Sequence, residues 1–182
     1  MIRASGSSIR ALHQGDADRA AALRAEAEAA LREAVSALTP HPAIYHAGFL
    51  HDAAKEFVEA SVLAALLDGG SAVPGPDDLG VEPPAWLNGV AEAASELRRN
   101  LLDRLREGDL ERGEALLGQM ESAYDALVAV DLPDALSGGL RRTVDALRAV
   151  LERTRSDVTI TVLQERLRRA IEGRADGDPS VH

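Results

Sequence analysis

Apolar side chains recur every three or four residues along most of the chain, which is the spacing of one face of an α-helix. The clearest example is the apolar face of residues 17–38, made of Leu23, Ala27, Ala30, Leu31, Ala34 and Leu38. The pattern predicts helices over about 2–13, 17–38, 43–67, 83–107, 110–130, 132–155 and 157–172. Short connections make successive long helices antiparallel neighbours. We therefore predict an all-α bundle of about six or seven long antiparallel helices.

Capping and helix-breaking residues set the boundaries of these segments. Asp16 and Asp109 are suited to cap the helices that follow them, because an aspartate side chain accepts hydrogen bonds from free backbone N–H groups. Residues 68–82 form the one long predicted loop. Ser156 and Asp157 are predicted to begin a last helix. Residues 158–162 alternate like a strand, but the cap and the downstream apolar periodicity favour a helix.

Composition supports helices and narrows the chemistry. Hydrophobic residues make up 46% of the 182 residues and aromatic residues only 3%, so the core must consist of Ala, Leu and Val, which favours close-packed helices over a sheet. There is no cysteine, hence no disulfide and no thiolate metal site. We expect one domain over 1–172 with a polar tail over 173–182. No segment resembles a signal peptide or a membrane span, so we expect a cytoplasmic protein without a membrane partner.

The formal net charge of −10 argues against a nucleic-acid partner. Two features weaken that argument. Lys55 is the only lysine, so every other fixed positive charge is an arginine, which is the better phosphate ligand. Carboxylates that hold a divalent metal ion also become a locally positive site once the metal is bound.

Glu59 lies within the apolar run 57–67, which predicts a helix buried on most of its faces. An ionised carboxylate is costly there unless a cation, an arginine or a proton compensates it. Glu56 lies three residues earlier, about 60° around the helix, so the two carboxylates share a face. These acids are the first candidate functional residues.

A second acidic pair, Glu92 and Glu96, lies on the helix predicted over 83–107, about 40° apart on one face. Gly, Ala and Ser residues surround the pair, so another helix can approach closely. If this helix packs against the one that carries Glu56 and Glu59, four carboxylates converge. Mg²⁺ or Mn²⁺ favours such oxygen ligands and could activate water to attack a phosphodiester or pyrophosphate.

Structural explanations remain open for the same residues. Most acids spaced three or four residues apart on helices are solvated, and a buried glutamate can pair with an arginine, here Arg98 or Arg99. His46 and His51 are typical of surface or helix-face positions, and the chain lacks the Glu-x-x-His pattern of di-iron bundles.

Three segments resemble a known family. Residues 55–60, Lys-Glu-Phe-Val-Glu-Ala, resemble the Gln-Glu-Tyr-Val-Glu-Ala segment of Trax, the catalytic partner of translin. Residues 87–97, Leu-Asn-Gly-Val-Ala-Glu-Ala-Ala-Ser-Glu-Leu, resemble the family stretch Tyr-Leu-x-Gly-Val-x-Asp-x-x-Gly-Glu-Leu. Residues 79–83, Leu-Gly-Val-Glu-Pro, resemble the Leu-Gly-Ile-Glu-Pro of translin. The similarity covers most of the chain in order, so the chain resembles an archaeal-type translin/Trax homologue.

The resemblance implies a seven-helix protein that assembles into a hollow homo-octamer and binds single-stranded RNA or DNA. It assigns metal binding and catalysis to Glu56, Glu59, Glu92 and Glu96, as in Trax. Glu92 stands where Trax has aspartate. Nucleic-acid contacts are expected from residues near the same segments: Arg10, His13, His46, His51 and Arg99.

The sequence thus favours a single-stranded RNA-binding protein with Mg²⁺- or Mn²⁺-dependent endoribonuclease activity. One alternative is a binding scaffold without catalysis, in which the acids are structural. Another is a helical Mg²⁺-dependent nucleotide pyrophosphohydrolase of the MazG type. Subunit contacts are expected from the last two predicted helices, with four leucines as candidates: Leu140, Leu147, Leu163 and Leu167.

Overall fold

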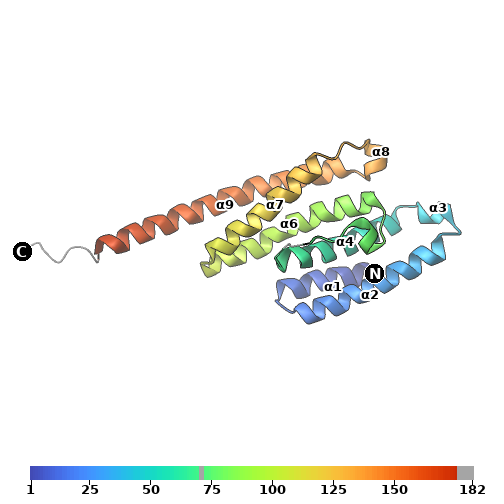
Figure 1. Ribbon diagram of the computed structural model, residues 1–182, viewed down its shortest axis with the longest axis horizontal. Coiled ribbons are helices and arrows are strands. Elements are labelled where there is room, and N and C mark those ends of the chain that lie inside the picture. Colours follow the sequence, from blue (N-terminus) through green and yellow to red (C-terminus); the bar gives the residue numbers. More distant parts are fainter. Residues whose placement is uncertain (70–71, 176–182) are drawn as a thin grey trace, which may run out of the picture.

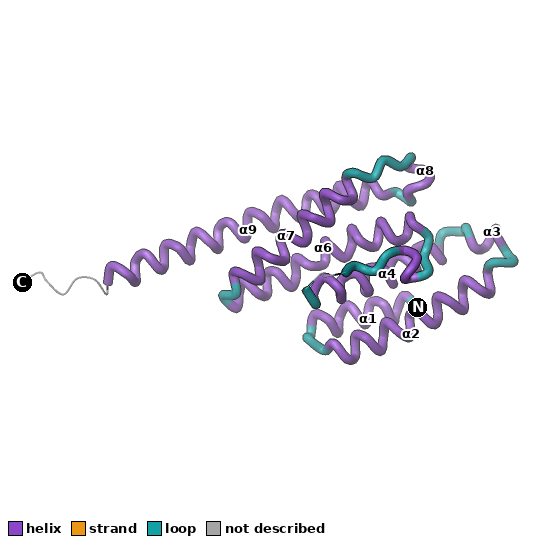
Figure 2. Tube along the Cα trace, in the orientation of Figure 1, coloured by secondary structure: helices purple, strands orange, loops and turns teal. Residues whose placement is uncertain are grey.

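The computed structural model describes residues 1–69 and 72–175, and these form helices and loops alone (Figure 2). The described residues form six long helices: α1 (Ile2–His13), α2 (Ala17–Leu38), α4 (Phe49–Leu67), α6 (Pro83–Glu107), α7 (Leu110–Val128) and α9 (Leu140–Ala175). Three four-residue helices lie in the connections: α3 (Pro42–Tyr45), α5 (Pro76–Leu79) and α8 (Asp134–Ser137). The prediction of an all-α bundle with six or seven long helices is confirmed.

The long helices pack side by side in three pairs (Figure 1). The α1–α2 pair lies at one edge, α4 and α6 lie in the middle, and α7 and α9 lie at the other edge. Helix α6 packs against α4, α7 and α9, and it is therefore the central element of the bundle. Among the described residues, no helix is both long and apolar enough to span a membrane.

Small side chains let the two central helices approach closely. Gly89 of α6 lies against α4, where an added Cβ would stand 2.6 Å from the Cβ of Val58 and 2.8 Å from the carbonyl oxygen of Lys55. Only glycine fits this spacing, since real Cβ atoms do not approach other atoms so closely. Leu97 and Leu101, one and five residues after Glu96, are fully buried in the main core. This packing brings the acidic face of α4 to that of α6.

The helix boundaries predicted at Asp16, Gly108 and Asp109 are confirmed. The side chain of Asp16 accepts a hydrogen bond from the backbone N–H of Arg19, and Asp109 does the same for Arg112. Gly108 ends α6 in the left-handed conformation, with φ of 82°.

Several boundaries differ from the prediction. The segment 43–67 divides into α3 and α4, because the chain turns at Gly48, whose φ of 102° suits glycine alone. The predicted loop over 68–82 contains α5, and α7 ends at Val128 rather than at residue 130. The segment 132–155 is not one helix, since α8 and a turn precede the start of α9 at Leu140.

The predicted helix start at Ser156 and Asp157 is wrong, because α9 continues through both residues. The carboxylate of Asp157 does not cap a helix but binds Arg98 of α6, with Nη2 at 2.7 Å from Oδ2. Residues 173–175 of the predicted polar tail continue α9, and the remainder, 176–182, lies outside the described residues.

The C-terminal half of α9 extends beyond the ends of the other helices (Figure 1). It carries an exposed apolar stripe made of Ile160, Leu163, Leu167 and Ile171, which are between 54% and 62% exposed. Leu140 and Leu147, expected at a subunit contact, are instead buried in the core of the single chain. Of the four candidate leucines, only Leu163 and Leu167 are free to contact another subunit.

Candidate carboxylate centre and adjoining pocket

The four sequence-predicted acids come from the facing sides of α4 and α6, and they converge on Glu59. The pKa of Glu59 is raised to about 8, first by burial and then by the negative charges of Glu92, Glu56 and Glu96. The positive charge of Lys55 opposes this rise. Because such charge effects act over short distances inside a protein, the other three carboxylates lie near Glu59, and we call this group of four the carboxylate centre.

Two of the four carboxylates have a basic side chain as partner. Lys55 Nζ donates to Glu92 Oε1 at 2.8 Å, across the α4–α6 contact. His13 Nε2, at the end of α1, lies 2.6 Å from Glu96 Oε1. In the described part of the chain, the carboxylates of Glu56 and Glu59 make no hydrogen bond or ion pair. Glu59 is therefore a half-buried acid without a partner.

The two partners differ in their surroundings. The hydrogen bond from His13 lowers the pKa of Glu96 against the opposing effect of burial, and the positive charge of Arg99 contributes less. The side chain of His13 is only 3% exposed, and its buried Nδ1 has no hydrogen-bond partner. Burial would lower the pKa of Lys55, but its hydrogen bond to Glu92 and the nearby acidic charges raise it overall.

The predicted arginine partners do not form pairs with these glutamates. Arg98 donates instead to Thr154 Oγ1 at 2.9 Å and to Asp157 Oδ2 at 2.7 Å, tying α6 to α9. Arg99 is exposed and acts on Glu96 only through its charge.

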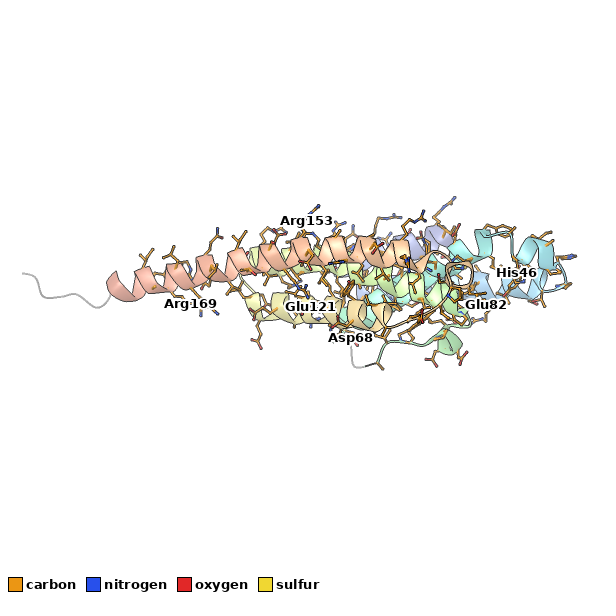
Figure 3. The ribbon with its side chains drawn as sticks, turned by 90° about the horizontal axis from the view of Figure 1, so that it is seen from above. His46, Asp68, Glu82, Glu121, Arg153 and Arg169 are labelled. Atoms are coloured by element: carbon orange, nitrogen blue, oxygen red, sulfur yellow. The ribbon has the colours of Figure 1, made fainter. Side chains whose placement is uncertain are left out.

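A cavity of about 460 Å³ opens beside the carboxylate centre. We call it the end pocket. Lys55 and Glu92 form its boundary with the carboxylate centre, and His46, His51 and Arg142 also line it. It lies where the α3–α4 turn, the start of α6 and the α8–α9 turn meet. Figure 3 shows His46 and Glu82, another lining residue, near the end of the molecule opposite the free part of α9.

The five residues predicted to contact nucleic acid do not gather at one place. His46 and His51 line the end pocket. Arg10 is exposed on α1 and donates to Ser7 Oγ at 2.8 Å, and Arg99 is exposed on α6. His13 is almost fully buried, so it could reach nucleic acid only by giving up its bond to Glu96.

Comparison with solved structures decides the family. The crystal structure of AfC3PO is 36% identical in sequence, with a TM-score of 0.81, and the match covers 88% of this chain and 83% of that one. A complex of AfC3PO with duplex RNA is 34% identical, with a TM-score of 0.80, over 90% of this chain and 84% of that one. The chain belongs to the translin/Trax family of C3PO proteins.

Other comparisons add less about this translin/Trax-family chain. Apo-NeC3PO shares the fold, with a TM-score of 0.75 at 22% identity over 88% of this chain and 83% of that one. An uncharacterised protein of Methanocaldococcus jannaschii is 29% identical over 122 residues, which are 66% of this chain and 54% of that protein. The chain thus spans about half the length of this curated relative. No protein-family model matches it.

The carboxylate centre of this family member suits a hard divalent cation by its ligand type, since it offers four carboxylates and one of them, Glu59, lacks a partner. It is not arranged as a finished metal site. In residues 1–69 and 72–175, no three His, Asp or Glu side chains are placed to hold one metal ion. Glu92 and Glu96 are directed to Lys55 and His13. Metal binding would therefore require each of these two carboxylates to turn away from its present partner, or to bind the metal through its second oxygen while keeping that partner.

Four residues at the carboxylate centre and the end pocket were not predicted as site residues. Helical spacing indicates two of them. Lys55 lies four residues before Glu59, and Asn88 lies four residues before Glu92, so each shares a face with a predicted acid. Arg142 and Thr143 reach the end pocket from the start of α9. The local sequence pattern placed them inside a different helix.

Proposed function

We propose that this chain binds single-stranded RNA and hydrolyses its phosphodiester bonds with Mg²⁺ or Mn²⁺ held by Glu56, Glu59, Glu92 and Glu96. The observation that carries the proposal is the convergence of the other three carboxylates on half-buried Glu59. Support for RNA comes from AfC3PO, which has the same fold at 34% identity in its complex with duplex RNA. The likeness to C3PO proteins over most of the chain also favours this function over the MazG-type pyrophosphohydrolase.

The chain's own residues would contribute binding, charge compensation and proton release. Without metal, Glu59 holds its proton at neutral pH because its pKa is about 8. Binding a dication stabilises the ionised form, so metal uptake releases a proton from Glu59. A bound Mg²⁺ or Mn²⁺ would supply Lewis acidity to the phosphate and activate water for attack. Lys55, once released from Glu92, would carry a free ammonium group at the boundary with the end pocket, where it can attract a phosphate.

A non-catalytic scaffold is the second candidate, and a specific observation favours it. Lys55 and His13 already compensate two of the four carboxylates without any metal. In that case the acids would stabilise the α1–α4–α6 contact, and RNA would bind elsewhere without being cleaved.

Cleavage of a labelled single-stranded RNA with Mn²⁺ and with EDTA separates the two candidates. The nuclease proposal predicts cleavage with Mn²⁺, none with EDTA, and none by the Glu59→Gln variant. Glu114→Gln is the matched control, since it makes the same change at an exposed position of α7. RNA binding without cleavage by the parent protein would favour the scaffold. Cleavage by Glu59→Gln at the parent rate would refute the proposed site.

We also propose that copies of the chain assemble through the exposed apolar stripe of α9. Four large aliphatic side chains on one helix face are costly in water. Assembly into the homo-octamer implied by the resemblance would cover them.

A further inference from the structure

The end pocket is a distinct feature from the carboxylate centre, although Glu92 belongs to both and Lys55, the partner of Glu92, also lines the pocket. Its volume of about 460 Å³ lies in the range of sites that enclose a small organic ligand. Base-paired RNA is too large to enter such a space. A single nucleotide that has left its neighbours is of the right size.

The lining offers the two kinds of group that a nucleotide needs. Flat rings lie on the α3–α4 side, where Tyr45 and His46 meet edge to face with their centroids 4.9 Å apart, and His51 follows on α4. Such rings can stack on a nucleobase. Arg142 lies on the α9 side, and its guanidinium makes no ion pair or hydrogen bond with the described residues. A free guanidinium is suited to bind a phosphate.

The acidic groups in the lining do not oppose this assignment. Glu92 is compensated by Lys55. Glu82 lies close enough to Tyr45 that its negative charge raises the pKa of the phenol, after the larger effect of burial. The third acid, Asp52, is exposed on α4. These carboxylates can accept hydrogen bonds from base amino groups or ribose hydroxyls, which leaves the phosphate to Arg142.

One wall of the end pocket is held in place by Asn88, which is only 2% exposed. Its Nδ2 donates at 2.9 Å to the carbonyl oxygens of Pro84 and Ser137, and its Oδ1 accepts from Thr143 Oγ1 at 2.6 Å. These bonds fix the α8–α9 turn and the start of α9 against α6. Arg142, next to Thr143, is therefore carried on an anchored backbone.

His51 is placed by the same turn. Gly138 has a φ of 60°, and a Cβ at this position would stand 3.0 Å from the ring carbon Cε1 of His51. The glycine thus lets the imidazole pack against the turn. Because both walls are fixed before a ligand arrives, the end pocket has the preorganisation expected of a binding site.

We propose that the end pocket binds one unpaired nucleotide of an RNA strand, with its phosphate on Arg142 and its base against the rings of His46 and His51. The proposal rests on the RNA function inferred above and adds a nucleotide-specific subsite beside the carboxylate centre. A strand held in this way would place the adjoining phosphodiester at Lys55 and Glu92.

Calorimetric titration with adenosine 5′-monophosphate and uridine 5′-monophosphate in EDTA tests the subsite apart from cleavage. We expect binding by the parent protein and about tenfold weaker binding by Arg142→Ala and by His46→Ala, the effect of losing one charged hydrogen bond or one stacked ring. Arg141→Ala and His41→Ala are matched controls, because both residues are exposed and lie outside the pocket lining. Inorganic phosphate should bind more weakly than either nucleotide. Absent nucleotide binding, or equal losses in the variants and their controls, would overturn the subsite.

A second arm distinguishes a nucleotide of a strand from a free nucleotide. Single-stranded RNAs with one abasic position, moved stepwise along the sequence, should lose affinity for the parent protein but not for His46→Ala. If mononucleotides bind but no abasic position matters, the strand assignment is overturned. If the parent cleaves RNA with Mn²⁺ but binds no mononucleotide, the subsite is overturned while the proposed nuclease function stands. If mononucleotides bind and abasic positions matter but RNA is never cleaved, the subsite stands and the nuclease function fails.

Discussion

Replacing Glu59 by glutamine should make the metal-free protein more stable at alkaline pH. Glu59 is held half-buried next to three other carboxylates, and its pKa rises from 4.5 to about 8, first through burial and then through their charges. Glutamine keeps the size and hydrogen-bonding capacity of the side chain but never ionises. The variant therefore removes the cost of a buried negative charge and leaves the packing of α4 against α6 unchanged.

The expected pH window follows from the direction of the pKa change. Below pH 4.5 the carboxyl is protonated in both the folded and unfolded states, so it imposes no penalty. Between pH 4.5 and 8 the folded state retains a proton that the unfolded state loses, so the free energy of unfolding falls as pH rises. At 1.36 kcal/mol per pH unit, the rise to about 8 corresponds to a loss of about 5 kcal/mol above pH 8, as an upper limit.

Urea denaturation in EDTA, measured from pH 5 to 9 for parent and variant, gives this difference directly. The stability gained by Glu59→Gln should be small at pH 5, should grow through neutral pH and should level off above pH 8. Taking the difference between the two proteins cancels the titration of distant groups. Glu114→Gln should show no such trend. A gain that does not depend on pH, or a variant less stable than the parent at pH 9, would refute the electrostatic argument.

Three further changes test packing, charge and assembly. Gly89→Ala should lower the free energy of unfolding in urea by about 1–3 kcal/mol, because the new Cβ would stand 2.8 Å from the carbonyl oxygen of Lys55. The substitution gains about 1 kcal/mol in helix propensity, which is smaller than the cost of a strong clash. A more stable variant would contradict the close packing. Lys55→Gln should bind Mn²⁺ more tightly by calorimetry, because the ammonium no longer competes for Glu92; weaker binding would show that Lys55 supports the metal instead. The double change Leu163→Glu with Leu167→Glu should give smaller species by light scattering with unchanged helix content by circular dichroism, and full native mass would place the interface elsewhere.

Local signals in the sequence predicted much of the fold. Asp16, Gly108 and Asp109 end or begin helices through bonds to backbone groups within four residues, so their effect does not depend on the rest of the chain. The break expected at Asp157 failed because its carboxylate binds Arg98, 59 residues away, and a distant arginine cannot be recognised from the local pattern.

The candidate site was also predictable where it depends on local spacing, and not where it depends on distant contacts. Helical spacing put Glu56 with Glu59 on one face and Glu92 with Glu96 on another, and the structure brings these faces together. The pairing of Lys55 with Glu92 depends on the register of α4 on α6, which the contact at Gly89 fixes only in three dimensions. The contribution of α9 to the end pocket depends on where that helix begins, and the anchoring of its first turn by Asn88 could not be read from neighbouring residues.

The central claim is that the carboxylate centre holds a divalent metal ion, and a crystal structure of the protein grown with Mn²⁺ tests it most directly. Anomalous scattering locates Mn²⁺ independently of the surrounding atoms. The account predicts a Mn²⁺ ion bound by oxygens of Glu59 and at least two of Glu56, Glu92 and Glu96, with Lys55 withdrawn from Glu92. Mn²⁺ bound only elsewhere, with the Lys55–Glu92 and His13–Glu96 pairs intact, would contradict the claim and leave these acids a structural role.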